Sequence, residues 1–216
     1  MTVILFFTII NTKRKDLRTG KLMYIIIFIL CYLFGNFNAA YIYGKLTKKT
    51  DIRQHGSGNA GTTNAMRVMG IKAGLIVFIL DFLKGLAAVF IAGILSDGEY
   101  AQAIAALAVI IGHNWPMFLK FKGGKGIATL IGAYTIIAPI PLLIALVIAF
   151  IIIYFTKWVS LASLCGIYSI VVMLIITQGL SINSILTLII AAISTFQHRQ
   201  NIKRIIKGQE NKLELY

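Results

Sequence analysis

The sequence predicts an all-α fold: a polytopic bundle of about seven transmembrane helices, with glycine-rich loops gathered on the cytoplasmic side. Hydrophobic residues make up 58% of the 216 residues and charged residues only 13%, against about 25% charged in a soluble domain. Apolar runs of about 14–22 residues recur along the chain and are continuous rather than alternating, which favours helices over barrel strands. The runs leave no room for a separate soluble domain.

Seven segments are candidate spans. Three of them are shorter than the roughly 20 residues that cross the hydrocarbon core, so five or six spans are also compatible with the pattern. The seven segments are residues 23–44, 71–95, 100–118, 127–138, 142–155, 159–176 and 182–196.

The distribution of charge predicts the orientation of the bundle. The net charge is +14, and the basic residues lie in alternate loops: 45–72, 120–125, Lys157 and the tail after residue 198. The intervening loops 96–99, 139–141 and 177–181 contain no Lys or Arg. By the positive-inside rule, we expect the basic loops and the C-terminus to face the cytoplasm. An anionic substrate or lipid surface is a second explanation of the charge.

The first 22 residues oppose this orientation. Five basic residues between Lys13 and Lys21 would stand on the outer side, directly before the first span, and the apolar run 3–10 is too short to reverse the topology. A signal-like region would carry its charges before the apolar run, not after it. We therefore expect residues 1–22 to be a dispensable extension, with a single transmembrane domain at 23–216 and a native start at Met23.

Two ionisable residues lie inside the second span. Asp81 and Lys84 are three residues apart and share one helix face. Because a lone charge in the bilayer is costly, we expect an ion pair that faces the bundle interior, with a proton relay as the alternative.

The first polar segment, residues 56–67, alternates glycines with small polar side chains and ends in Arg67. Glycines allow a ligand to approach the backbone closely, and a guanidinium fits phosphate oxygens. An ordinary flexible loop would not need so many polar side chains. The candidate binding residues are Ser57, Asn59, Gly61, Thr63, Asn64 and Arg67.

The second segment, residues 112–129, contains a Gly-Gly-Lys-Gly turn directly before a predicted helix. A helix N-terminus attracts anions, and Lys125 adds a full positive charge. The turn is not a nucleotide-binding loop of the Walker type, because Gly126 rather than Ser or Thr follows the lysine. His113 in this segment is compatible with either packing or catalysis. The candidate anion-binding residues are Lys122, Gly123, Gly124, Lys125 and Gly126.

The third segment follows the last span. If the helix continues, His198 and Asn201 lie on one face. A basic amphipathic tail on anionic lipid would explain the Lys and Arg residues here, but not the pairing of His198 with Asn201.

Together the three segments resemble the integral-membrane acyl-phosphate:glycerol-3-phosphate acyltransferases (the PlsY type) of bacterial phospholipid synthesis. The resemblance runs from Met23 to about Glu210 and includes residues 159–163. It rests on Ser57-Gly58-Asn59-x-Gly61-x-Thr63-Asn64-x-x-Arg67, on Gly112-His113 with Phe121-Lys122-Gly123-Gly124-Lys125-Gly126-x-Ala128-Thr129, and on His198-x-x-Asn201.

The resemblance implies that the hydroxyl of glycerol 3-phosphate attacks an acyl phosphate, giving lysophosphatidic acid and inorganic phosphate. It implies membrane lipid as the surroundings, and no cofactor, metal or nucleic acid. The residues expected to act in catalysis are Ser57, Arg67, Lys125, His198 and Asn201. Those expected to bind substrate are Asn59, Gly61, Thr63, Asn64, Lys122, Gly123, Gly124 and Gly126, together with Ser160 and Ser163, which would close the site.

Two alternatives remain open at this stage. A transporter of an organic phosphate would also need basic loops and broken helices, but it should place polar groups near the middle of the membrane. If the protein is an acyltransferase, the general base is either His198 or the phosphate of the substrate, whose second pKa is about 6. The His-x4-Asp pair of soluble acyltransferases is absent, since Ala60, Phe118 and Lys203 stand five positions after the three histidines.

Overall fold

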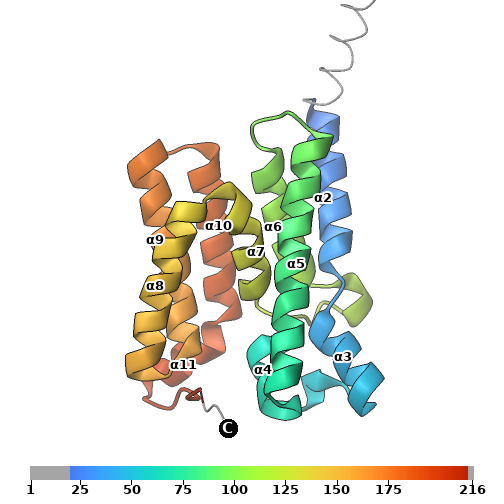
Figure 1. Ribbon diagram of the computed structural model, residues 1–216, viewed down its shortest axis with the longest axis vertical. Helices are drawn as coiled ribbons and strands as arrows, with labels where there is room; N and C mark the ends of the chain where they lie inside the picture. The colour runs from blue at the N-terminus through green and yellow to red at the C-terminus, as the bar shows by residue number, and fades with distance from the viewer. Residues whose placement is uncertain (1–19, 214–216) are drawn as a thin grey trace, which may run out of the picture.

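The computed structural model describes residues 20–213, and this part of the chain is helical with no strand, so the all-α prediction is confirmed (Figure 1). Two short 3-10 turns, Ile52–Gln54 and Met117–Leu119, interrupt the loops. The α-helices are α2 (Lys21–Gly35), α3 (Ala39–Lys48), α4 (Thr62–Met69), α5 (Ile71–Leu95), α6 (Ala101–Asn114), α7 (Ile127–Ile137), α8 (Pro139–Thr156), α9 (Val159–Gln178), α10 (Ile182–Gln197) and α11 (Arg199–Ile206).

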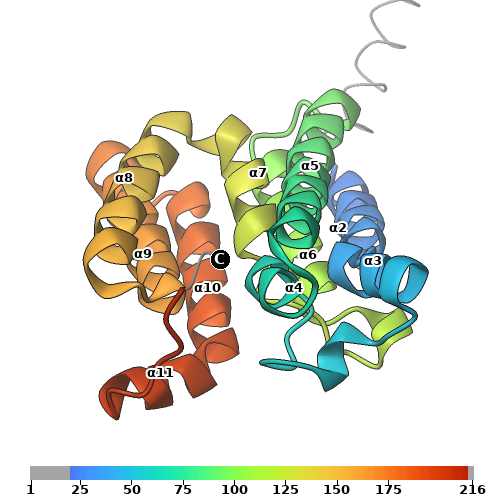
Figure 2. The ribbon, with the colours of Figure 1, turned by 60° about the horizontal axis from the view of Figure 1, so that its bottom comes forward.

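The long helices form two groups that stand side by side, α2, α5 and α6 in one and α8, α9 and α10 in the other, with α7 between them (Figure 1). The closest packing is of α5 on α7, α2 on α6, and α8 on α9. The short helices α3, α4 and α11 lie together at one end of the bundle, which Figure 2 turns toward the viewer. The three polar segments of the sequence therefore meet at this end.

The predicted first span, 23–44, is wrong as a single helix. The chain breaks at residues 36–38, between α2 and α3. Asn36 caps the end of α2 by donating from its side chain to the Tyr32 carbonyl, and the Asn38 side chain accepts from the Tyr41 N–H at the start of α3. The Lys84 ammonium donates to the Gly35 and Phe37 carbonyls, which the break leaves without helical partners.

The other span boundaries are close to prediction, and prolines explain the two largest shifts. α5 spans the predicted 71–95. α6 ends at Asn114 rather than near 118, because Trp115 precedes Pro116 and adopts a non-helical conformation. α8 begins at Pro139, three residues before the predicted start, because proline is well tolerated in the first turn of a helix.

Five segments of the described chain are long and apolar enough to cross a membrane, and the two apolar helices Ile127–Ile137 and Ile182–Gln197 are shorter. α7 is the shorter of these two apolar helices, and its 11 residues give a length of only about 16 Å. It begins well above the lower ends of α5 and α8 (Figure 1). The loop before α7 is therefore drawn into the bundle rather than left at its surface.

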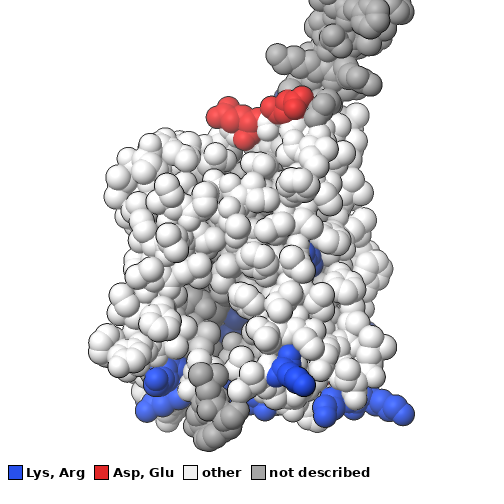
Figure 3. All heavy atoms as spheres, in the orientation of Figure 1, with Lys and Arg blue, Asp and Glu red and all other residues white. Residues whose placement is uncertain are grey.

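Charge is divided between the two ends of the molecule. On the face drawn in Figure 3, most Lys and Arg side chains gather at the end that carries α3, α4 and α11, the visible Asp and Glu side chains lie at the opposite end, and the surface between them carries little charge. The predicted extension 1–22 lies almost wholly outside the described residues, and α2 begins at Lys21.

Glycines bring the helix pairs into backbone contact. A Cβ added to Gly85 of α5 would lie 1.9 Å from the Thr129 carbonyl oxygen, and one added to Gly132 of α7 would lie 1.9 Å from the Phe82 carbonyl oxygen. Gly35 and Gly112 make the same kind of approach between α2 and α6. Close backbone approach through small residues is a usual way for helices to associate in membranes.

This packing predicts that two Gly→Ala substitutions differ in their effect on the free energy of unfolding. Gly132→Ala drives a Cβ into backbone and should lower the free energy of unfolding by about 2 kcal/mol or more. Gly166→Ala is the control, because its Cβ would find its nearest neighbour at 3.5 Å, an ordinary contact. Thermal unfolding in detergent, followed by intrinsic fluorescence, measures both. Equal unfolding midpoints would show that the α5–α7 crossing is not as tight as described.

Candidate active site

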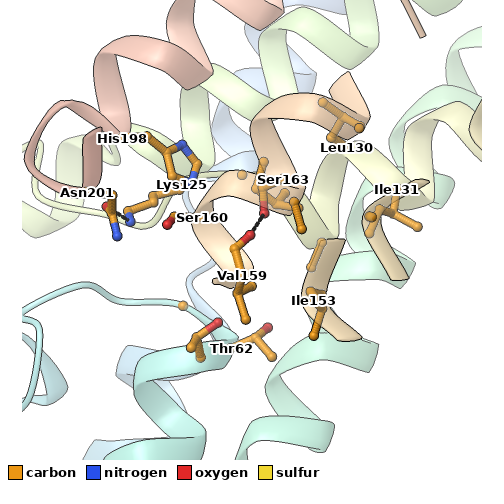
Figure 4. Close-up of a pocket in the computed structure, with 18 of the residues that line it drawn as sticks. Thr62, Lys125, Leu130, Ile131, Ile153, Val159, Ser160, Ser163, His198 and Asn201 are labelled. Atoms are coloured by element: carbon orange, nitrogen blue, oxygen red, sulfur yellow. Dashed lines mark hydrogen bonds between the residues drawn. The ribbon is translucent and has the colours of Figure 1, made fainter. Parts of the chain in front are cut away.

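A cavity of about 410 Å³ opens between the two helix groups at the end that carries the polar segments. In Figure 4 its polar side carries Lys125, Ser160, His198 and Asn201, and its other side carries apolar side chains such as Leu130. Thr62, at the start of α4, stands across the cavity from this polar group (Figure 4). The cavity thus combines a polar end with an apolar arm.

Most of the predicted site residues line this cavity. Lys122, Gly123 and Gly124 do not belong to the lining. The predicted residues that do are Ser57, Asn59, Gly61, Thr63, Asn64, Arg67, Lys125, Gly126, Ser160, Ser163, His198 and Asn201.

Lys125 lies at the polar end and connects the loop before α7 to α11. Its ammonium donates to the side-chain oxygen of Asn201 on α11 (Figure 4). Burial is the largest influence on the pKa of Lys125 and lowers it; the Glu210 carboxylate raises it, the charges of Arg204 and Arg67 lower it, and the net pKa is about 8. The ammonium is therefore charged at neutral pH but close enough to its pKa to respond to a bound anion.

His198 is neutral, and its tautomer follows from its contact. Its Nδ1 lies 2.8 Å from the Ser194 carbonyl oxygen, which can only accept, so Nδ1 carries the hydrogen and Nε2 is an acceptor. Burial, together with the nearby Lys125 charge, lowers the pKa of His198 to about 4.

Glu210 was not predicted, yet it organises the polar end. Its carboxylate accepts from Ser160 Oγ at 3.0 Å, from Asn201 Nδ2 at 2.6 Å and from Arg204 Nε at 2.9 Å. The tail is held further by the Leu213 N–H, which donates to the Lys157 carbonyl. The sequence held two signals: Arg204 is three residues after Asn201 on one helix face, and Glu210 is an acid within a basic tail.

Asn64 shapes the first polar segment from within. Its side-chain oxygen accepts from the Ser57 N–H at 2.8 Å, and its amide nitrogen donates to the His55 and Asn59 carbonyls at 3.0 Å. Asn64 is 1% exposed. These bonds fix the loop that presents Ser57 and Asn59 to the cavity, and direct binding of substrate by Asn64 stays a prediction.

The Gly123–Gly124 pair packs against the end of α6. The Gly123 and Gly124 N–H groups donate to the Asn114 and His113 carbonyls at 3.2 and 3.1 Å. A Cβ on Gly123 would lie 2.0 Å from the His113 carbonyl oxygen, so only glycine fits. Because both N–H groups are engaged, the predicted phosphate cradle made from these two amides finds no support in this geometry.

Lys122 is exposed and lies outside the cavity lining, so its predicted part in binding a substrate anion also finds no support. Arg204 of α11 lies at the cavity instead. The Ser163 hydroxyl donates to the Val159 carbonyl within its own helix (Figure 4).

Two helix N-termini meet at the cavity. Gly61 precedes α4 and Gly126 precedes α7, both line the cavity, and neither supplies a side-chain cap to its helix. Uncapped first-turn N–H groups favour anions. Lys125, Arg67 and Arg204 carry positive charge at the polar end, and only the Glu210 carboxylate among these four side chains opposes them. The net charge of the four is positive, which suits binding of phosphate groups.

Comparisons with known proteins show what the chain is similar to. The family model described as "Glycerol-3-phosphate acyltransferase" matches residues 25–208. A glycerol-3-phosphate acyltransferase of Thermoanaerobacter pseudethanolicus is 50% identical over 86% of this chain and 93% of its own length. That of Alkaliphilus metalliredigens is 42% identical over 88% and 95%.

Two solved structures share the fold. The crystal structure of PlsY (YgiH), an integral membrane glycerol 3-phosphate acyltransferase, in its glycerol 3-phosphate form has a TM-score of 0.82 at 34% identity, covering 88% of this chain and 96% of that one. Its lysophosphatidic acid form has a TM-score of 0.79 at 34% identity, covering 88% and 95%.

The contacts of Glu210 predict a measurable loss of stability on its removal. Glu210→Ala leaves the Arg204 charge and the donors of Ser160 and Asn201 without their acceptor, which should cost about 1–3 kcal/mol and lower the unfolding midpoint by several degrees. The exposed neighbour supplies the control, Gln209→Ala, which should leave the midpoint unchanged. If the two variants unfold together, the tail does not hold the polar end.

Proposed function

The chain belongs to the glycerol-3-phosphate acyltransferase family, and from that premise we propose that its cavity transfers a fatty acyl group from acyl phosphate to the primary hydroxyl of glycerol 3-phosphate. The products are lysophosphatidic acid and inorganic phosphate. The observation that carries the proposal is the joining of a cationic end and an apolar arm in one cavity. Both substrates carry phosphate, and one carries an acyl chain.

The cationic end supplies the phosphate contacts. Lys125, Arg67 and Arg204 come from three separate segments and line the cavity together with the uncapped starts of α4 and α7. Point charges and helix N-termini bind phosphate oxygens without base or cofactor chemistry. Two anions held side by side put the acceptor hydroxyl next to the acyl carbonyl, and this positioning lowers the barrier.

The reaction needs little acid assistance. The hydroxyl oxygen attacks the carbonyl carbon, the bond from that carbon to the phosphate oxygen breaks, and phosphate leaves with the electron pair. Lys125 stabilises the negative charge on the carbonyl oxygen and on the leaving phosphate. The Nε2 acceptor of His198 orients the hydroxyl. Because the pKa of His198 is lowered to about 4, substrate phosphate, with a second pKa of about 6, is the better final acceptor of the proton.

The apolar arm holds the acyl chain. It runs between α7, α8 and α9, and its floor is formed by the buried residues Leu142, Ala145 and Ile170. From Ser160 to Ile170 along α9 the arm extends about 15 Å. An extended chain advances about 1.2 Å per bond, so roughly twelve bonds fit. Phe150 lines the cavity and is also exposed on the outer surface of the bundle, so the arm opens toward lipid at this residue.

From the positive-inside rule we infer that the basic end, and with it the cavity, faces the cytoplasm of a bacterial cell. Soluble glycerol 3-phosphate reaches the cavity from that side and the acyl substrate from the bilayer. Family membership sets aside the organic-phosphate transporter that the basic loops alone also suggested.

The choice of acyl donor tests the proposed function. Purified protein is given labelled glycerol 3-phosphate with either palmitoyl phosphate or palmitoyl-CoA, and labelled lysophosphatidic acid is measured. Palmitoyl phosphate should be the faster donor, because its phosphate is bonded directly to the reacting carbonyl and can occupy the cationic end. Faster turnover with palmitoyl-CoA would reject acyl phosphate as the donor.

The apolar arm predicts a change in chain preference. Ala145→Phe fills the floor of the arm and should reduce kcat/KM for palmitoyl phosphate about tenfold or more, with a much smaller effect on decanoyl phosphate. Val147→Phe is the matched control, since Val147 is on the same helix but 53% exposed and outside the cavity lining. The same chain-length profile in both variants would show that the acyl chain lies elsewhere.

A further inference from the structure

A buried ionic cluster touches the cavity but has no part in the mechanism above. Asp81 and Lys84 of α5 and His113 of α6 are each at most 3% exposed. The Lys84 Nζ lies 3.0 Å from Asp81 Oδ1 and 2.9 Å from His113 Nδ1, and His113 Nδ1 lies 3.4 Å from the same Asp81 oxygen. Asp81 and His113 also line the cavity.

These distances fix the tautomer of His113. An ammonium group has donors only, so at 2.9 Å from Lys84 the Nδ1 atom must accept. A hydrogen on Nδ1 would point at the ammonium, and the 3.4 Å separation from Asp81 is too long to compensate. His113 is therefore neutral, with its hydrogen on Nε2.

The Nε2 edge of the ring lies against the glycine-lysine turn. A Cβ on Gly124 would stand 2.1 Å from His113 Nε2, so glycine at this position leaves room for the imidazole beside Lys125. Among residues 20–213, the polar contacts of the His113 ring all involve Nδ1. With Nδ1 turned toward Lys84, the Nε2–H is the polar group that the ring can offer to the cavity.

We propose that His113 is a further catalytic residue, a neutral Nε2–H donor to a negatively charged substrate oxygen held beside Lys125. This deepens the proposed function and rests on it. Lys84 and Asp81 act as positioning residues, because they set the tautomer and keep the ring from turning. A preorganised donor of this kind needs no reorganisation as charge develops on the oxygen.

Two substitutions separate this role from packing. The amide nitrogen of Gln reaches as far as Nε2, so His113→Gln keeps a donor toward the cavity and gives up the acceptor for Lys84. The shorter His113→Asn keeps a partner for Lys84 and gives up the cavity donor. We expect His113→Asn, which removes the donor, to lower kcat/KM about 10²-fold. His113→Gln keeps a donor, so its kcat/KM should stay within about tenfold of the wild-type value.

Kinetics identify the oxygen that is contacted. A rise in KM for glycerol 3-phosphate points to the acceptor phosphate, a rise in KM for acyl phosphate to the donor phosphate, and a fall in kcat alone to the carbonyl oxygen; each supports the proposal. Near-wild-type activity in His113→Asn, or His113→Gln as impaired as His113→Asn, would overturn it. A wild type that transfers no acyl group would instead reject the proposed function.

Nitrogen-15 NMR of histidine-labelled wild-type protein tests the tautomer without relying on the folding of the His113 variants. The chain has three histidines, and His55→Gln and His198→Gln assign the signals. His113 should carry its proton on Nε2 and His198 on Nδ1, and glycerol 3-phosphate or acyl phosphate should shift the His113 Nε2 signal. A proton on Nδ1 of His113, or an Nε2 signal that neither substrate moves, would refute the inference.

Discussion

The ammonium group of Lys84 is the interaction on which the rest of the structure depends. It bonds Asp81 on its own helix, His113 on α6, and the Gly35 and Phe37 carbonyls where the first apolar segment breaks. A charge and two unpaired carbonyls within an apolar bundle are each costly, but together they satisfy one another. The break turns the chain into α3 and carries the first polar segment beneath the cavity. Removing one partner of such a buried cluster leaves the others uncompensated.

The site is built outward from the same cluster. The His113 carbonyl receives the Gly124 N–H, and the Ala60 N–H donates to the Gly123 carbonyl, so the first two polar segments are fixed to one another. Lys125 then donates to Asn201 of α11, and the Glu210 carboxylate accepts from the same asparagine. Short α7 draws this loop into the bundle, where a cationic group can lie next to an apolar arm. That adjacency is what joining an acyl chain to a phosphorylated alcohol requires.

Hydropathy was enough to predict the helical class and most span boundaries, because a run of apolar residues by itself indicates a segment that lies in lipid. The bounds of α5 are those predicted, residues 71–95. The break at 36–38 was missed although Asn36 and Asn38 are polar, because apolar residues continue on both sides of them. The stabilising partner of the break, Lys84, lies far along the chain. The motifs marked the cavity correctly but not every role. Gly124 makes room for a ring, Lys122 faces outward, and Arg204 and Glu210 enter through tertiary contacts. Pattern identifies residue types, whereas packing decides which atoms face a ligand.

The central claim is that Lys125 binds substrate phosphate as an ammonium. Burial lowers the pKa of Lys125 to about 8, and a bound phosphate dianion favours the charged form and raises that pKa again. Calorimetric titration of glycerol 3-phosphate at pH 8, in two buffers with different heats of ionisation, measures the protons taken up on binding. The account predicts uptake of about half a proton by the wild type, and none by Lys125→Met where residual binding persists. Binding without proton uptake in the wild type, or equal uptake by the variant, would contradict it.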